Sequence, residues 1–478
     1  MRNFLVNPIK KKQYVLLFVD SILIELAFFL AYTIQTSELS IANLLPTYHI
    51  FLCFPIYIVL FYIFELYRVT IKQSAPEWFL YSLLAVLVAN GGLAILFFFV
   101  FPQTQINRIT LLLQIPFMVV GLVVWRVIFF NYLIHSQNPR RILFIGEGDS
   151  YKLLAQELET SHVKEYKIAG IVTDEETDID SFDQDISKIP IRRQEDKSKI
   201  YNELTTSAIA GKLEQFVKEL NIDLIVFSLN YCQSEDIFKQ LIELQFHNGV
   251  TVYDMPNFYA NLTGKVPASS INSSWILNYL NNSYYSNFSK VGRFLDIVGS
   301  VIGLTLLCPL FLVIAIAIKL DSRGPVFFKQ ERLGWNKKPF TIIKFRSMIP
   351  EKQKTAKWAT EEKDRITRVG NFLRKSRLDE FPELINVLSG KMSIIGFRPI
   401  RKEFADKLAS KIPFYSLRFT IKPGLTGWPQ VKYGYAGSEE GQFEKFQYEL
   451  FYLKNASFFL DGYIFVKTFQ TLLWRRGE

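Results

Sequence analysis

Two adjacent carboxylates, Asp379 and Glu380, lie at the start of the stretch LDEFPELINVLSGKMSIIGFRP at 378–399. Pro382 suits the first turn of a helix and Gly390 suits the position just past its end, so we predict the pair at a helix N-terminus. An acidic first turn is usually a helix cap, and the pair taken alone favours that interpretation. The helix should bury the apolar residues that recur at helical spacing, which are Phe381, Leu384, Ile385 and Leu388.

Basic residues surround this pair and change its interpretation. They are Arg365, Arg368, Arg374, Lys375 and Arg377 upstream, and Arg398 downstream. A helix N-terminus with converging arginines binds anions, and phosphates best. Carboxylates repel a nearby phosphate unless a divalent cation bridges them, as Mg²⁺ does with one or two carboxylates and phosphate oxygens. Together these residue types predict phosphoryl transfer, in which a carboxylate can also be the nucleophile.

The chain has few other reactive groups near the pair. None of its four histidines lies after His247, so chemistry there must use carboxylates, Lys, Arg, hydroxyls or a bound metal. The cysteines, Cys53, Cys232 and Cys308, are far apart in sequence and provide neither a disulfide framework nor a Cys-x-x-Cys metal site.

The composition indicates a membrane protein with attached soluble parts. Hydrophobic residues make up 49% of the 478 residues, and 43 of them are phenylalanine. The net charge of +10 fits contact with anionic lipid headgroups or a phosphorylated substrate. Nucleic acid is not expected as a partner, because the basic residues accompany apolar segments rather than a motif that reads DNA or RNA.

Four apolar stretches fill the N-terminal region, and each has roughly the ~20 residues of a spanning helix. They lie at about 14–34, 48–67, 78–101 and 109–134, which predicts a four-helix transmembrane bundle over residues 1–137. The distribution of Lys and Arg between the stretches places the N-terminus and everything after residue 138 in the cytoplasm. For the charges inside the stretches we favour interhelical pairing over a transport or headgroup path; these are Asp20, Glu25, Glu65 and Arg126.

Residues 138–258 alternate strand and helix patterns, which predicts a Rossmann-like α/β module with a parallel sheet. Strands are expected within 140–150 and at 168–174, 224–230 and 250–258, with a helix at 211–223. Tyr151 occupies the third glycine position of the turn Gly146-x-Gly148, and the region has no Tyr-x-x-x-Lys pair. We therefore favour a structural or regulatory module over a nucleotide site, and we expect neither a nicotinamide nor a flavin.

After a connector at 259–289, an apolar run at about 291–320 contains Pro309, which removes a backbone hydrogen bond from a helix. A kinked spanning helix would export everything after it, whereas a re-entrant helix broken at Pro309 would return the chain to the cytoplasm. The strongly basic sequence that follows favours the re-entrant form. The C-terminal domain, 290–478, is then expected to be α-rich and catalytic, with this helix in one leaflet.

Three runs of the C-terminal domain carry a specific pattern. They are GPVFFKQERLGWNKKPFTIIKFRSM at 324–348, RITRVGNFLRKSRLDEFPELINVLSGKMSIIGFRP at 365–399 and KPGLTGWPQV at 422–431. They resemble the bacterial sugar transferase family, the monotopic polyprenyl-phosphate phosphoglycosyl transferases, and the preceding regions resemble the large form of that family. The resemblance implies transfer of a sugar-1-phosphate from a UDP-sugar to undecaprenyl phosphate, with release of UMP. This would be the first membrane step of exopolysaccharide, capsule or O-antigen synthesis, on the cytoplasmic face of the bacterial inner membrane.

The resemblance also implies roles for single residues. Asp379 would be the nucleophile toward the β-phosphorus, through a covalent intermediate, and Asp379 and Glu380 would hold Mg²⁺ or Mn²⁺. The residues assigned to substrate phosphates and nucleotide are Lys344, Arg346, Arg374 and Arg398, to which we add Arg332. Those assigned to the lipid phosphate and the membrane interface are Arg293, Asp296 and Pro309.

The sequence departs from the family pattern before Pro309, where Cys308 replaces a serine, and at three further positions. Phe397 replaces a proline before Arg398, Lys337 stands where a glycine is usual, and Glu449 stands where Asp is frequent. None of these changes removes a charged group assigned above.

Several alternatives stay open on the sequence. The transfer could be direct, with Asp379 only holding the metal. The chain could also be an inactive regulatory or scaffold protein of a polysaccharide assembly complex, or a nucleotide-sugar dehydratase or epimerase, which the missing Tyr-x-x-x-Lys disfavours. Trp428 could line a sugar or uridine pocket or pack in a core, and the segment 458–476 could lie at the membrane interface or pack as a core helix. Expected partners are UDP-sugar, undecaprenyl phosphate, membrane lipids and a second copy in a homodimer.

Overall fold

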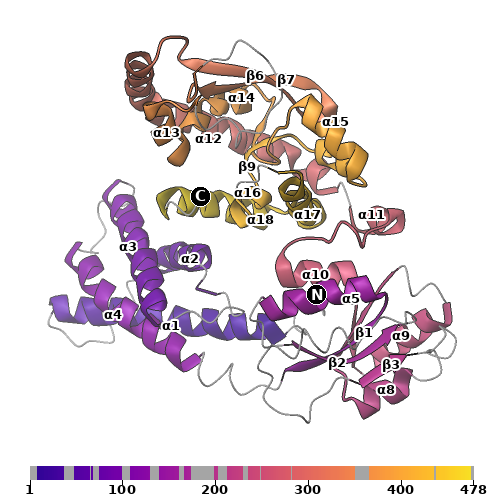
Figure 1. Ribbon diagram of the computed structural model, residues 1–478. Coiled ribbons are helices and arrows are strands. Elements are labelled where there is room, and N and C mark those ends of the chain that lie inside the picture. The colour runs from indigo at the N-terminus through magenta and orange to yellow at the C-terminus, as the bar shows by residue number, and fades with distance from the viewer. Residues whose placement is uncertain are drawn as a thin grey trace. The chain divides into compact units, whose positions relative to one another are not determined.

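The structure is a computed structural model (Figure 1). It describes residues 8–36, 48–64, 66–67, 75–99, 108–129, 139–160, 166–173, 199–202, 213–229, 235–247, 249–280, 283–349, 365–434 and 438–474. The chain forms two compact units, of which the first comprises 1–140 with 158–167 and the second comprises 141–157 with 168–478.

In the described part of residues 1–140 there are four helices, one for each apolar stretch of the sequence. They are α1 (Pro8–Thr36), α2 (Tyr48–Ile63), α3 (Ala75–Phe99) and α4 (Arg108–Ile128). Helix α4 packs against both α1 and α3, and α2 packs against α3. Leu16, Phe28, Tyr57 and Met118 are among the buried side chains that these contacts bring into one core.

A buried ion pair joins α1 to α4. Arg126 donates from Nη1 to Oδ1 of Asp20 at 2.8 Å and from Nη2 to Oδ2 at 2.6 Å, and both side chains are 0% exposed. Arg126 Nε also donates to the carbonyl of Leu66 at 3.1 Å. The predicted interhelical pairing is therefore confirmed for these two residues, whereas Glu25 is exposed and Glu65 lies outside the described residues.

Four helices in the described part of the chain are long and apolar enough to cross a membrane: α1, α3, α4 and α12 (Ser283–Asp321). Helix α2 has 16 residues. At ~1.5 Å per residue it is roughly 24 Å long, short of the ~30 Å hydrocarbon core. The second predicted span is thus shorter than expected, and α12 is the fourth candidate. By length and composition these helices indicate a membrane protein.

The second unit begins with a five-stranded sheet in the order β3-β2-β1-β4-β5. The strands are β1 (Arg140–Ile145), β2 (Tyr166–Thr173), β3 (Lys199–Asn202), β4 (Leu224–Phe227) and β5 (Thr251–Asp254), accompanied by α5 (Gly148–Thr160), α8 (Leu213–Glu219) and α9 (Glu235–His247). The pairs β1–β4, β2–β3 and β4–β5 are parallel. The predicted parallel α/β sheet is confirmed, although β3 was not foreseen.

The last predicted strand of this sheet, 250–258, is partly wrong. Only Thr251–Asp254 is a strand, and α10 (Met255–Thr263) begins immediately after it. Asp254 caps this helix by accepting from the backbone N–H of Asn257 at 2.7 Å, and Pro256 occupies the first turn. Both features start a helix, and they outweigh the apolar pattern.

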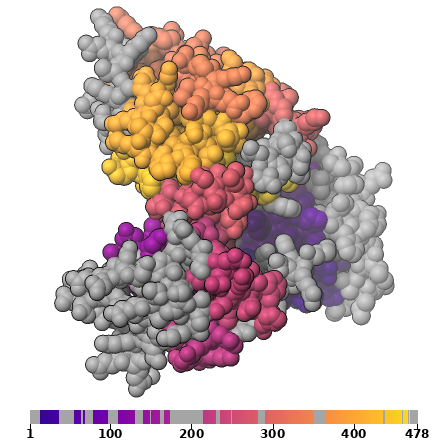
Figure 2. Space-filling view, turned by 90° about the vertical axis from the view of Figure 1, so that its right-hand side faces the viewer, coloured from indigo at the N-terminus to yellow at the C-terminus, as the bar shows by residue number. Residues whose placement is uncertain are grey.

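The connector after the sheet is part of the core of the C-terminal domain. Ala260 and Val266, together with Trp275 of α11 (Ser273–Tyr279), share one buried cluster with Phe446 and Leu450. The last two residues belong to α17 (Glu439–Asn455). In Figure 2 this connector lies directly against the C-terminal domain.

The C-terminal domain combines helices with two small sheets. Its elements after α12 are β6 (Phe327–Leu333), η4 (Trp335–Lys337), β7 (Pro339–Phe345), α13 (Arg368–Lys375), η6 (Leu378–Glu383), α14 (Leu384–Leu388), β8 (Ser393–Ile395), α15 (Lys402–Lys411), η7 (Tyr415–Thr420), β9 (Gly424–Thr426), α16 (Trp428–Lys432), α17 and α18 (Phe458–Trp474). Strands β6 and β7 form an antiparallel hairpin, and β8 pairs with β9 in parallel.

Helix α12 runs without interruption through Pro309, which corrects the predicted break at this residue. A proline removes one backbone hydrogen bond, and the rest of a 39-residue helix keeps its ladder. Many apolar side chains of α12 are exposed, among them Ile302, Leu306 and Leu312. Such a surface suits contact with lipid, and the re-entrant path itself stays a prediction.

Candidate active site

Asp379 and Glu380 lie in a 3₁₀ turn, η6, which leads directly into α14. The sequence placed a helix start here correctly, but the first turn is tighter than an α-helix. Gly390 has a φ of 79°, the left-handed conformation expected just beyond a helix end. Arg377, immediately before the pair, has a φ of 53°, which is unfavourable for a residue with a Cβ atom.

The buried face of α14 differs from the prediction. Ile385 is 40% exposed and Leu388 is 37% exposed, whereas Asn386 is 3% exposed. The amide of Asn386 accepts from Ile343 N at 3.0 Å and donates to Thr341 O at 2.7 Å. These bonds attach α14 to β7, and they explain why a polar residue replaces apolar ones on the inner face.

Glu380 is held between two cations. Lys344 of β7 donates to Oε1 at 3.0 Å, and Arg398 reaches both oxygens, with Nη1 at 3.1 Å from Oε2 and Nη2 bonded to Oε1. Burial alone would raise the pKa of Glu380, but Arg398 and Lys344 outweigh it and keep the pKa well below its ordinary value. Glu380 is therefore an ionised group whose charge the protein itself compensates.

Lys344 also binds a third carboxylate that the sequence analysis missed. Its Nζ lies 2.9 Å from Oε1 of Glu383, whose side chain is 2% exposed. Burial raises the pKa of Glu383 above its ordinary value. The only sequence signal was its position three residues after Glu380, the spacing of neighbours on one helical face.

Asp379 differs from both neighbours. Its side chain makes no hydrogen bond or ion pair with any residue that the structure describes. Burial and the charge of Glu380 raise the pKa of Asp379 to about 6, although Lys344 and Arg398 act in the opposite direction. Two adjacent carboxylates thus have opposite states, one compensated by the protein and one left for another partner.

Close backbone packing fixes the position of Arg398. A Cβ atom on Gly424 of β9 would lie 2.1 Å from the backbone nitrogen of Gly396, so this approach requires glycine. Phe397 is 2% exposed and its ring lies 5.7 Å from that of Tyr452. The departure at Phe397 is therefore a core residue, and the side chain of Arg398 stays 39% exposed beside Glu380.

The structure does not turn Arg346 toward the pair. Its Nη1 donates to Arg323 O at 3.0 Å and its Nη2 donates to Ser322 O at 2.8 Å, and the residue is 3% exposed. These bonds satisfy carbonyls at the C-terminal end of α12. Arg346 holds the membrane helix onto the domain, and its assignment to substrate phosphate stays a prediction.

Arg293 and Asp296 also attach α12 to the domain. Arg293 donates to the carbonyls of Val387 and Leu388, both at 2.6 Å, at the end of α14. Asp296 accepts from Ile394 N of β8 at 2.8 Å. Both thus tie the start of α12 to the segments on either side of Gly390, and their contact with lipid phosphate remains a prediction.

Arg332 and Arg374 each have a buried donor atom without a hydrogen-bond partner in the described part of the chain, Nε and Nη1 respectively. Arg332 lies on β6, where burial and the charge of Arg398 lower its pKa to about 10. Arg374 lies in the last turn of α13, which packs against η6. Buried donors without a protein partner are suited to an anion that completes their hydrogen bonds.

Lys445 of α17 is a further cation that sequence reasoning missed. Burial and the nearby charge of Arg398 lower its pKa to about 8. No sequence signal pointed to it, because it lies far along the chain from the pair.

Packing contacts describe three further positions of the C-terminal domain. Trp428 is 6% exposed, stacks on Phe451 with ring centroids 5.3 Å apart, and is a core residue. Helix α18 packs on β8 and β9 with Ile464 fully buried. Lys337 has a φ of 59°, a conformation that glycine adopts without strain, which explains the family preference there.

A divalent cation fits this donor set in one way. Within the described residues there is no group of three or more His, Cys, Asp or Glu side chains that could hold a metal. Both oxygens of Glu380 are engaged by cations, so Asp379 is the carboxylate with free oxygens. An ion would therefore depend on Asp379 and on the phosphate oxygens of a substrate, and Glu380 would join only by releasing a cation.

Comparisons with known proteins agree with this geometry. A family model described as bacterial sugar transferase matches residues 287–475, and one described as CoA-binding domain matches residues 62–256. The UDP-N-acetylgalactosamine-undecaprenyl-phosphate N-acetylgalactosaminephosphotransferase of Aeromonas hydrophila is 40% identical over 225 residues, 47% of this chain and 52% of that protein. The UDP-glucose:undecaprenyl-phosphate glucose-1-phosphate transferase of Escherichia coli is 41% identical over 186 residues, 37% of this chain and 40% of that protein.

The chain thus spans about half the length of these two curated relatives. The chain matches a larger share of another relative, the UDP-glucose:undecaprenyl-phosphate glucose-1-phosphate transferase of Caulobacter vibrioides. The two are 38% identical over 184 residues, which are 38% of this chain and 69% of that protein. The residues matched by the family model, 287–475, include Asp379, Glu380 and Arg398. The chain therefore belongs to the bacterial sugar transferase family.

Proposed function

We propose that the protein transfers a sugar-1-phosphate from a UDP-sugar to undecaprenyl phosphate and releases UMP. The observation that carries this proposal is the free carboxylate of Asp379 beside the cation-bound carboxylate of Glu380. An anionic substrate needs a positive group within reach, and Arg398, whose side chain is 39% exposed beside Glu380, is suited to this role. The names of the relatives agree with this reaction.

The reaction proceeds in two displacements at the β-phosphorus. An oxygen of Asp379 forms a bond to this phosphorus, and the bond from the phosphorus to the oxygen shared with the α-phosphate breaks. UMP leaves with that oxygen and with the electron pair. An oxygen of undecaprenyl phosphate then attacks the same phosphorus, and the bond to Asp379 breaks to regenerate the carboxylate.

No proton transfer is required at either step. UMP leaves as a phosphate anion, and a lipid phosphate is already ionised near neutral pH. This agrees with a C-terminal domain whose sequence holds no histidine. A divalent cation, when bound, would neutralise negative charge on the diphosphate, while Arg398 and Lys344 keep Glu380 from repelling the donor.

The proposal includes a location and partners. The active site lies on the cytoplasmic face of the bacterial inner membrane, where α12 brings the domain to its lipid acceptor. Membrane lipids cover the apolar surface of α12, and the protein acts as a homodimer.

The test uses the full-length protein in detergent or lipid nanodiscs with Mg²⁺, undecaprenyl phosphate, and either UDP-glucose or UDP-N-acetylgalactosamine. UMP release from one donor is expected, and it should depend on the lipid acceptor beyond the first turnover. Omitting the acceptor should leave a sugar-phosphate mass on the peptide that contains Asp379. Failure of every UDP-sugar to release UMP contradicts the function and leaves an inactive scaffold. Turnover without any adduct contradicts the covalent step and favours direct transfer.

A further inference from the structure

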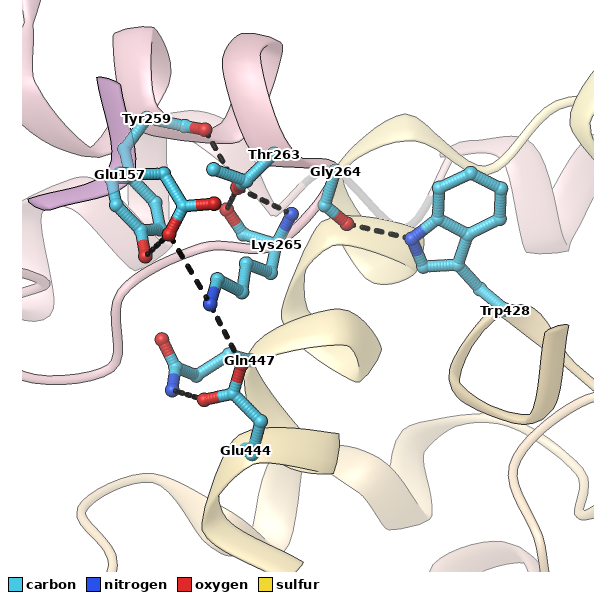
Figure 3. A network of polar contacts seen from close by, with 8 residues as sticks. All are labelled: Glu157, Tyr259, Thr263, Gly264, Lys265, Trp428, Glu444 and Gln447. Carbon is cyan, nitrogen blue, oxygen red and sulfur yellow. Dashed lines mark hydrogen bonds and ion pairs between the residues drawn. The ribbon is translucent and has the colours of Figure 1, made fainter. Parts of the chain in front are cut away.

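Lys265 links the sheet module to the C-terminal domain. Its Nζ lies 2.7 Å from Oε1 of Glu444 on α17 and 3.8 Å from Oε2 of Glu157 on α5, and the lysine side chain is 14% exposed (Figure 3). Tyr259 of α10 donates to the same Glu157 oxygen at 3.2 Å. One partly buried lysine thus connects a helix of the sheet module to a helix of the C-terminal domain.

The backbone around Lys265 is fastened as well. Val266 N donates to Gln447 O of α17 at 2.9 Å, and Trp428 Nε1 donates to Gly264 O at 2.7 Å. The side chain of Gln447 donates to Glu444 at 2.7 Å, which orients the carboxylate that Lys265 binds (Figure 3). The segment 264–266 is therefore held on both sides of Lys265.

A second carboxylate of the same helix, five residues after Glu444, connects α17 to the active site. Glu449 of α17 is 4% exposed and accepts from Arg418 Nη2 at 2.9 Å. That same nitrogen donates to the backbone carbonyl of Arg398 at 3.0 Å. Arg398 in turn binds Glu380 with both of its terminal nitrogens. One continuous set of contacts thus runs from Lys265 through α17 to the active-site pair.

We propose that α17 is a positioning element for the reaction: Lys265 fixes it through Glu444, and Glu449 on the same helix fixes the backbone of Arg398 through Arg418. Lys265, Glu449 and Arg418 are positioning residues, because they act through Arg398. This assigns the sheet module a contribution to turnover that needs no bound nucleotide. The inference rests on the proposed function for its kinetic test only.

Lys265→Met removes the charge at a similar side-chain length. We expect kcat for UMP release to fall about 3- to 30-fold, the range for coupling of roughly 0.5–2 kcal/mol. Lys265→Arg should restore most of the activity. Lys239→Met is the matched control, since Lys239 forms an exposed pair with Glu235 at 3.2 Å on α9.

A double variant tests whether the effect travels through Arg418. Arg418→Lys keeps a charge opposite Glu449 but loses the planar fork that reaches the carbonyl of Arg398. Adding Lys265→Met to Arg418→Lys should then cause little further loss, because both act on one path. If the losses of activity from the two substitutions multiply, Lys265 and Arg418 act independently, and the proposed path from Lys265 to Arg398 is wrong.

Hydrogen exchange gives a readout that needs no activity. The N–H of Gly424 donates to the carbonyl of Phe397 at 2.9 Å, next to Arg398. Faster exchange of this amide in Lys265→Met, but not in Lys239→Met, supports the proposed path from Lys265 to Arg398. Unchanged exchange in Lys265→Met contradicts it. If Lys265→Met does not fold, Glu444→Gln tests the same contact with a smaller change. A wild-type protein that releases no UMP contradicts the proposed function. The exchange experiment still tests whether Lys265 positions Arg398.

Discussion

The first unit and the second unit each bury carboxylates, Asp20 beside Arg126 in the first and the neighbours Asp379 and Glu380 in the second. In the first set, both carboxylate oxygens face both terminal nitrogens of one arginine, and neither side chain is exposed. In the second set, Lys344 and Arg398 both bind Glu380, and the oxygens of Asp379 stay free. The ion pair of Asp20 with Arg126, which we call the closed pair, uses all of its charge to join two helices. The carboxylate of Asp379 has no such partner and can therefore react with a substrate.

The largest effect is expected for Asp379→Asn. This substitution removes the carboxylate of the pair that forms no ion pair with Lys344 or Arg398. We expect UMP release to fall by about 10³-fold or more, because the amide cannot form the bond to phosphorus. The sugar-phosphate adduct should disappear in the same variant. An asparagine variant with substantial turnover would show that Asp379 is not the nucleophile.

The closed pair should behave in the opposite way. Arg126→Met leaves the carboxylate of Asp20 buried and uncompensated, and should destabilise the protein by about 3–5 kcal/mol. Combining it with Asp20→Leu should recover most of that loss, which thermal unfolding in detergent would measure. Turnover per folded molecule should stay near wild type in both. A loss of specific activity that persists in the double variant would assign this pair a functional role.

Glu380→Gln sharpens the comparison within the active site. It keeps the shape of Glu380 but removes the charge that holds Arg398, so Arg398 becomes free to bind Asp379, while Lys344 keeps its ion pair with Glu383. We expect kcat to fall about 10- to 100-fold. The dependence of the rate on Mg²⁺ concentration should also weaken or shift. Wild-type kinetics and metal dependence in this variant would contradict both effects.

The smallest of the four expected effects is the dependence of the rate on pH, which should follow the ionisation of Asp379. Because burial and Glu380 raise the pKa of Asp379 to about 6, the group is protonated and inactive below that pH. The rate should therefore fall about tenfold per pH unit below about 6 and level off above it. A rate that stays constant down to pH 5 would show that Asp379 ionises at its ordinary, lower pKa.

Local patterns predicted much of the fold because they reflect contacts between near neighbours. Hydrophobic length gave α1, α3, α4 and α12, and alternating strand and helix patterns gave the parallel sheet. The same reasoning failed at Asp254, where a cap and a proline turned an expected strand into α10. It also failed for Ile385 and Leu388, because Asn386 takes the inner face through bonds to β7.

The sequence by itself determined the pair Asp379 and Glu380, the glycine that ends its helix, and the basic residues able to face a phosphate. Only the tertiary structure decided that Arg398 and Lys344 hold Glu380 while Asp379 stays free. It also decided which backbone carbonyls Arg346 and Arg293 bind. The physical reason is that a charge is compensated by whichever groups folding brings within hydrogen-bond distance. For Glu380 these groups come from β7 and from the loop after β8, and the order of residues along the chain does not specify their distances.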